Sequence, residues 1–231
     1  MLEPYIRLFI NYADWFISDL FLLIALGTGL ICYRYVYGGA RWLFWLLVLS
    51  FFVELLLIHY AALSKNNHFL LNVSSIIETA CLAGMYYSII MRKWSRIFIV
   101  VSFLIYLSIS IYSFEWLRIA DYMLGVQRLM MIVYVILYFQ YLLSELKVDY
   151  LMGHSFFWIS AGALLYASGT LFIFLFVKIT FGNPNDGDFS WYMHFAQAFN
   201  SFFYITLAVG FWLQRREIQL EQAKQGYKLG R

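Results

Sequence analysis

The sequence predicts an all-α membrane protein with seven transmembrane helices. Seven apolar segments follow one another, each about as long as the roughly 20 residues that a helix needs to cross a hydrocarbon core of about 30 Å. The composition agrees: 63% of the residues are hydrophobic and 13% are charged, whereas soluble domains carry roughly 25% charged residues. The eight tryptophans lie near segment ends, where amphipathic rings prefer the headgroup region.

The segments are separated by short links, so we expect one membrane domain. Residues 1–15 form an outer N-terminal segment, 16–213 the helical bundle and 214–231 a polar tail that extends the last helix. In chain order the predicted crossings are 16–36, 42–63, 69–91, 96–113, 119–143, 156–178 and 190–213.

Each segment has its own support in the sequence. The first and sixth carry small residues four positions apart, Ala25 with Gly29 and Ala163 with Ala167, which allow close helix packing. The second and fourth have tryptophans at their predicted inner ends, and the third and fifth are apolar around single buried charges. The seventh combines an apolar face with a polar stripe. Both prolines, Pro4 and Pro184, lie outside the segments, which predicts unbroken helices.

The distribution of Lys and Arg predicts the orientation. Eleven of these residues lie on the side of the first, third and fifth links and the tail, and four lie on the opposite side. Cytoplasmic loops are the basic ones. We therefore expect the N-terminus outside, the C-terminus in the cytoplasm, and a multi-pass protein of a bacterial inner membrane. The net charge of +3 is then an orientation signal, and we expect no nucleic-acid partner.

Four polar side chains are predicted to lie at one depth. Counted at 1.5 Å per residue from the outer helix ends, Glu54, Glu78, Arg128 and Asn200 all come to roughly 13–15 Å, near the middle of the membrane. Ionisable groups at this depth are costly and usually functional. This level is the strongest functional signal in the chain.

Helical spacing adds further groups to the layer. Asp121 lies two turns outward from Arg128 on the same face, and His194, Gln197 and Tyr204 form a stripe that Asn200 flanks. We expect a polar pocket that opens outward past Asp121, His59 and His194. Its candidate ligand-binding residues are Glu54, Glu78, Arg128, Gln197, Asn200, His194, Asp121 and Tyr204.

The charges in this layer allow three interpretations. One arginine cannot neutralise two glutamates, so one carboxyl is expected to keep its proton or to bind a cation. Alternatively, the forked donors of Arg128 anchor an anionic ligand. A structural ion-pair layer that sets the helix register is the third interpretation.

The sequence contains no pattern for a metal site, a cofactor or a catalytic residue. No two of the four histidines are four residues apart, as helical zinc ligands would be. Cys32 and Cys81 occur in different helices at different depths, and we expect buried thiols without a disulfide.

Three stretches carry a family resemblance. They are residues 75–78, residues 156–172, and Trp191 to His194 followed by Asn200 and Gly210 to Trp212. In these the chain resembles a group of small bacterial membrane proteins with seven predicted helices, often found as stand-alone units beside sensor histidine kinases. Where that group leads us to expect an acid in the fifth helix, this chain has Gln127. The resemblance implies a sensory role and a signalling partner such as a sensor histidine kinase.

The first hypothesis is therefore a sensor or receptor-like subunit that binds a small ligand, a lipid or a proton and signals through another protein. An intramembrane hydrolase or lipid-modifying enzyme is the alternative, with Glu78 as general base helped by Ser74, Ser75 or His194. A small transporter is a further alternative, which the scarcity of helix breaks disfavours.

Overall fold

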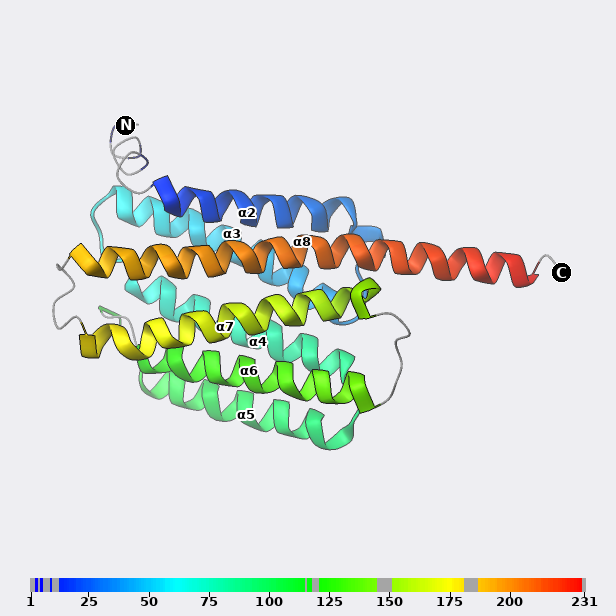
Figure 1. Ribbon diagram of the computed structural model, residues 1–231. Coiled ribbons are helices and arrows are strands. Elements are labelled where there is room, and N and C mark those ends of the chain that lie inside the picture. The colour runs from blue at the N-terminus through cyan, green and yellow to red at the C-terminus, as the bar shows by residue number, and fades with distance from the viewer. Residues whose placement is uncertain are drawn as a thin grey trace.

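The computed structural model describes residues 3, 5, 9, 13–114, 116–117, 121–144, 151–180 and 187–229. In this part of the chain the fold is all-α, with seven helices that run alternately in opposite directions (Figure 1). They are α2 (Ala13–Ile31), α3 (Gly39–Ala62), α4 (His68–Ile89), α5 (Lys93–Tyr112), α6 (Asp121–Ser144), α7 (Ser155–Thr180) and α8 (Gly187–Leu229). Two 3-10 turns, η1 (Tyr33–Tyr35) and η2 (Leu151–Gly153), lie in the links.

Six of these helices are long and apolar enough to cross a membrane, which confirms a multi-pass membrane protein by helix length and composition. The six spans lie in α3 to α8. The apolar part of α2, Phe16–Ile31, is shorter. The seven predicted segments thus correspond to six long apolar helices and one shorter one. Each of them is a single uninterrupted α-helix, as the position of the prolines predicts.

The predicted end of the first segment is wrong. α2 ends at Ile31, and the chain then tightens into η1 rather than continuing as an α-helix to Val36. The Tyr35 amide donates to the Cys32 carbonyl over 2.7 Å, and the Val36 amide donates to the Tyr33 carbonyl over 3.1 Å. Hydrogen bonds three residues apart define a 3-10 turn. Gly38, with a φ of 57°, then redirects the chain into α3.

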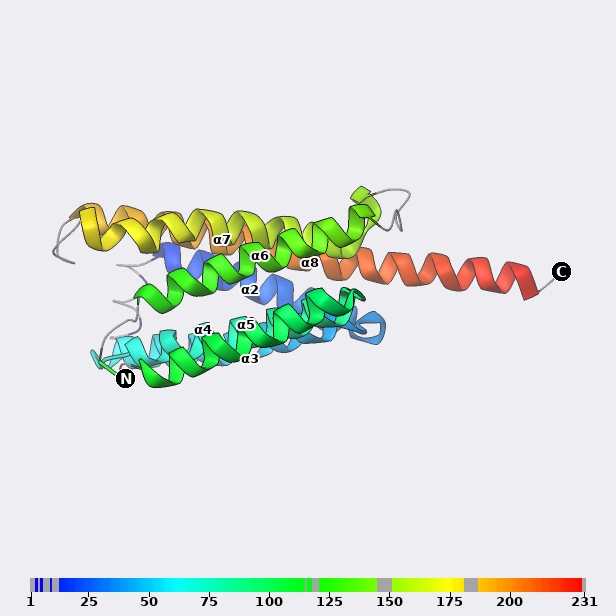
Figure 2. The ribbon, with the colours of Figure 1, turned by 90° about the horizontal axis from the view of Figure 1, so that it is seen from below.

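The helices pack as a ring of six with one helix outside. Around the ring, α2 contacts α3, α3 contacts α4, α4 contacts α6, α6 contacts α7, α7 contacts α8, and α8 returns to α2. α5 packs against the outside of α4 and α6 (Figures 1 and 2). The inner faces of six helices therefore point at one another, which is where the buried polar groups gather.

Small residues allow the helices of the ring to approach closely. A Cβ atom on Gly162 of α7 would overlap the Thr206 side chain of α8, and one on Gly84 of α4 would lie 2.5 Å from the Trp42 ring of α3. Ala163 and Ala167 are fully buried. The predicted packing role of the small residues in the sixth segment is confirmed.

α8 runs on beyond the bundle as one straight helix (Figure 1). Near the point where it leaves, Glu217 accepts hydrogen bonds from the Ser155 amide over 2.9 Å and the Ser155 hydroxyl over 3.0 Å. Its carboxylate also contacts His154 Nδ1 at 3.0 Å. A carboxylate at a helix N-terminus satisfies amides that have no partner within the helix. The emerging part of α8 is thus attached to the first turn of α7.

Candidate functional site

A buried ion pair joins α4 to α6 inside the ring. Arg128 Nη1 lies 3.0 Å from Glu78 Oε2, and the two side chains are only 6% and 13% exposed. The sequence predicts both residues at one depth, and the contact between α4 and α6 brings them together. A charge removed from water needs a close partner of opposite sign. The predicted association of Glu78 with Arg128 is therefore found.

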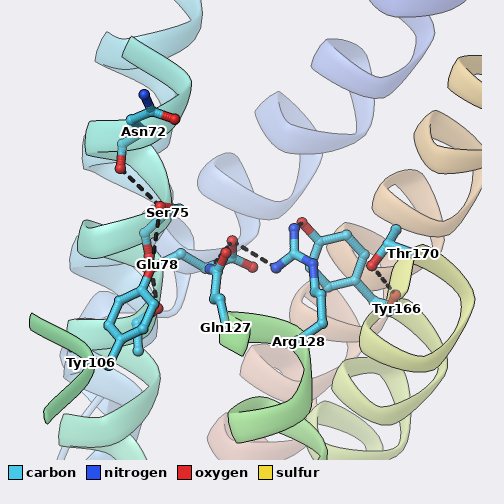
Figure 3. Close-up of polar contacts among 9 residues, drawn as sticks. Asn72, Ser75, Glu78, Tyr106, Gln127, Arg128, Tyr166 and Thr170 are labelled. Carbon is cyan, nitrogen blue, oxygen red and sulfur yellow. Dashed lines mark hydrogen bonds and ion pairs between the residues drawn. The ribbon is translucent and has the colours of Figure 1, made fainter. Parts of the chain in front are cut away.

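Gln127 is a third member of this group. Its Nε2 donates to the same Glu78 oxygen over 2.7 Å, and the residue is 1% exposed. Neighbouring residues of α6 thus hold one carboxylate oxygen from two directions (Figure 3). Gln127 is absent from the predicted site, and its position beside Arg128 is the one sequence signal that pointed to it. The Gln127 Oε1 atom is buried and makes no hydrogen bond within the described part of the chain.

Tyr166 of α7 contacts Arg128 of α6 and so extends the buried polar network to a third helix. Arg128 Nη2 donates to the Tyr166 hydroxyl over 2.6 Å, and its guanidinium carbon lies 4.2 Å from the centroid of the Tyr166 ring. The same hydroxyl also interacts with the Glu78 carboxylate. The Tyr166 ring stacks in parallel on Phe203 of α8, with centroids 5.1 Å apart. The Arg128 guanidinium on α6, the Tyr166 phenol on α7 and the Phe203 ring on α8 thus contact one another in that order.

Tyr166 is also missing from the predicted site residues. Its helical neighbours Ala163, Ala167 and Thr170 form a small-residue packing face with no charge. A tyrosine in such a face has no sequence feature that marks it as a partner of a buried arginine. Only the position of α7 next to α6 reveals the contact.

On the other side of Glu78 the polar contacts continue toward α5. The Ser75 hydroxyl donates to the Asn72 carbonyl over 2.8 Å and lies 3.2 Å from the Tyr106 hydroxyl (Figure 3). Glu78 Oε2 is occupied by Gln127 and Arg128. The hydroxyl contacts of Ser75 therefore run to Asn72 and Tyr106.

Glu54 lies in a different part of the layer from Arg128. The carboxyl groups of Glu54 on α3 and Asp19 on α2 are close enough to interact electrostatically. Neither makes an ion pair or hydrogen bond within the described part of the chain. Asp19 is absent from the predicted site although it lies within the first predicted segment. The ring order explains the arrangement, since α3 packs against α2 and α4, whereas α6 packs against α4, α5 and α7.

Two residues of α8 lie between the Asp19–Glu54 pair and the Glu78–Arg128 pair. Tyr204 is buried and lies within electrostatic range of Glu54, Glu78 and Tyr166. Asn200 Nδ2 donates to the Ser18 hydroxyl of α2 over 3.2 Å, and the Asn200 side chain also bonds to Tyr204. Tyr204 and Asn200 therefore lie between the Asp19–Glu54 pair and the Glu78–Arg128 pair.

The remaining predicted residues lie nearer the outer end. Gln197 is half-buried, and its backbone carbonyl accepts from Ser201 over 2.8 Å. His194 is exposed, and the side chain of Asp121 lies outside the described residues. His59 is exposed and its Nδ1 lies 2.9 Å from the Tyr5 hydroxyl. The opening past these groups stays a prediction.

In the described part of the chain, no cluster of three or more His, Cys, Asp or Glu side chains could hold a metal ion. Cys32 and Cys81 are buried free thiols, as the sequence predicts. The two best-formed hollows lie at the tail end of the bundle, and no residue of the buried polar layer lines either of them.

Comparison with known proteins finds no family model, no curated protein and no solved structure that matches this chain. The fold and the buried layer define its class, a multi-pass helical membrane protein with ionisable side chains inside the bundle.

Proposed function

We propose that this protein is a receptor-like subunit of a bacterial inner membrane that responds to protonation, or to a small cation, inside the bundle and signals through α8. The observation that carries the proposal is the contact chain from Glu78 through Arg128 and Tyr166 to Phe203. It links a buried ion pair to α8, which continues beyond the bundle.

The stimulus is assigned to the Asp19–Glu54 pair. In the described part of the layer, three carboxyl groups, those of Asp19, Glu54 and Glu78, accompany the single cation Arg128. Glu78 pairs with the arginine, so Asp19 and Glu54 lie within electrostatic range of each other with no cation beside them in the described part of the chain. Two partly buried carboxyls this close lower their energy when they share a proton or take up a cation.

Transmission to α8 follows from two neighbouring residues of that helix. The Phe203 ring stacks on Tyr166, the residue that contacts Arg128. Tyr204 lies within electrostatic range of Glu54. A change of charge at Glu54 alters the interaction with Tyr204 and with the Asn200–Ser18 bond between α8 and α2. A signal of this kind requires that the stimulus favours one of two helix arrangements.

The output is the emerging part of α8. With the C-terminus in the cytoplasm, this polar helix is presented to a partner such as a sensor histidine kinase. The Glu217 contacts with Ser155 connect the emerging part of α8 to the first turn of α7.

A distance measurement tests the proposal. Spin labels at Ser144→Cys on α6 and Gln219→Cys on α8, in a Cys32→Ala and Cys81→Ala background, report the position of α8 in lipid nanodiscs. Between pH 8 and pH 5 we expect the distance to change by about 1–2 Å or more, the size of common helix shifts. Glu54→Gln should abolish the change, and Glu221→Gln, on the tail, should preserve it. If the distance between the labels does not change with pH, or still changes in Glu54→Gln, then a structural ion-pair layer is the correct interpretation.

A further inference from the structure

A groove lies at the tail end of the bundle, between the end of α4 and the start of α5. Its volume is about 400 Å³. Lys93 and Arg96 line it together with Tyr87 and Met91, and its lining contains no carboxylate. The groove lies outside the buried polar layer, so its role is independent of the proposed function.

Arg96 is held in a defined orientation at this groove. Its Nε donates to the Ile90 carbonyl over 2.7 Å, its Nη2 contacts the Met91 sulfur at 3.0 Å, and its guanidinium lies 5.0 Å from the Tyr87 ring centroid. A guanidinium has five N–H donors, and these contacts use two. The remaining donors of a preorganised fork suit phosphate oxygens.

A second cation and a helix terminus add to the positive field. Lys93 is exposed and its ammonium makes no ion pair within the described part of the chain. α5 begins at this residue, and Arg92 provides no side-chain cap. The amides of a first helical turn carry partial positive charge and favour anions. Two cations and a helix N-terminus therefore converge on one hollow.

The groove continues into an apolar strip along α5. Ile97, Val100 and Val101 also line it and are 43%, 42% and 49% exposed. α5 is one of the helices that can span a membrane, and it packs on the outside of the ring (Figure 2), so we expect this exposed apolar strip to face hydrocarbon. A free phosphate would use the cations alone, whereas a phospholipid would use the cations and the strip.

We infer that this groove binds an anionic phospholipid, with the phosphate between Lys93 and Arg96 and an acyl chain along Ile97, Val100 and Val101. Basic pockets between helices at a membrane surface recognise lipid headgroups by this combination of charge and apolar contact. The bound lipid would fasten the outer helix α5 to the end of α4.

Native mass spectrometry of the full chain tests this site. The protein in neutral detergent is titrated with dioleoyl phosphatidylglycerol and, separately, with dioleoyl phosphatidylcholine. We expect one tightly retained phosphatidylglycerol per chain and weaker retention of phosphatidylcholine. Lys93→Gln should weaken phosphatidylglycerol binding roughly fivefold, and Lys93→Gln with Arg96→Gln about 25-fold. Phosphatidylcholine binding should stay unchanged.

Arg216→Gln is the matched control, because it removes an exposed cation at the same end of the bundle but outside the groove. It should retain phosphatidylglycerol as the wild type does. Since Arg96 also contacts Ile90, the exposed Lys93→Gln variant by itself keeps the test decisive if the double variant unfolds. Equal retention of both lipids, or equal losses in Lys93→Gln and Arg216→Gln, would overturn the inference. If millimolar inorganic phosphate competes as strongly as the lipid does, the ligand of this groove is a free anion and not a phospholipid.

Discussion

Arg128 Nη2 donates a hydrogen bond of 2.6 Å to the Tyr166 hydroxyl while Nη1 of the same guanidinium lies 3.0 Å from Glu78 Oε2. One side chain on α6 therefore joins α4 to α7. Because Tyr166 stacks on Phe203, the connection extends to α8 without a gap. Each contact in this series can be tested separately.

The hydroxyl of Tyr166 can be removed without removing its ring. Tyr166→Phe keeps the stacking on Phe203 but deprives Arg128 of an acceptor. A hydrogen bond to a charged group contributes about 1.5–3 kcal/mol in proteins, and membrane interiors give smaller average values of about 0.6 kcal/mol. We expect a loss of about 1–2 kcal/mol in the free energy of unfolding, measured in mixed micelles with increasing dodecyl sulfate. Thr170→Val, which removes a hydroxyl bonded only to the Tyr166 backbone carbonyl, is the control and should cost less.

Removing one member of the ion pair should cost more than removing both. Arg128→Met leaves the Glu78 carboxylate buried without its cation, and we expect a loss of about 3–5 kcal/mol in unfolding free energy. The double variant Glu78→Met with Arg128→Met leaves no buried charge at this pair and should recover most of that loss. The same unfolding measurement on Glu78→Met, Arg128→Met and the double variant gives the coupling free energy. A double variant as unstable as the sum of its single variants would argue against a dominant pairing.

Close packing between α7 and α8 depends on Gly162. An alanine there would drive its Cβ into Thr206, so Gly162→Ala should destabilise the bundle by about 1–3 kcal/mol. Gly27→Ala is the matched control, because a Cβ at Gly27 meets no atom within 4 Å. Thermal unfolding of the purified variants distinguishes them. If both alanines behaved alike, the tight α7–α8 contact would not be important for stability.

The Glu217 carboxylate should protect the first turn of α7. Glu217→Gln removes the charge, and Glu217→Ala also removes both acceptors of the Ser155 bonds, so Glu217→Ala should cost about 1 kcal/mol, as the loss of a helix cap does. We expect faster amide hydrogen exchange over residues 155–158. Glu221→Ala removes an exposed carboxylate one turn further along α8 and should leave the exchange of α7 unchanged. Equal protection in all three variants would show that another group holds this helix end.

The local sequence was sufficient to predict the helices and to place Glu78 and Arg128 at one level. A run of apolar residues decides that a helix forms in a membrane, and a constant rise of 1.5 Å per residue converts sequence position into depth. This arithmetic placed Glu78 and Arg128 at one level, and they form an ion pair. The same reasoning does not locate the end of α2. Residues 32–36 are apolar and aromatic, apart from Arg34, and this composition does not distinguish an α-helix from a 3-10 turn.

Which charges meet was decided by the tertiary structure alone. Depth does not say which helices are neighbours, and in this ring α6 packs against α4 and α7 while α3 packs against α2. Arg128 therefore contacts Glu78 and Tyr166, and Glu54 faces Asp19 instead. Sequence alone determined a helical membrane protein and predicted polar residues at one level of its helices. The partners within that layer depend on helix order and rotation, which arise from the packing of side chains far apart in the chain and leave no local signal.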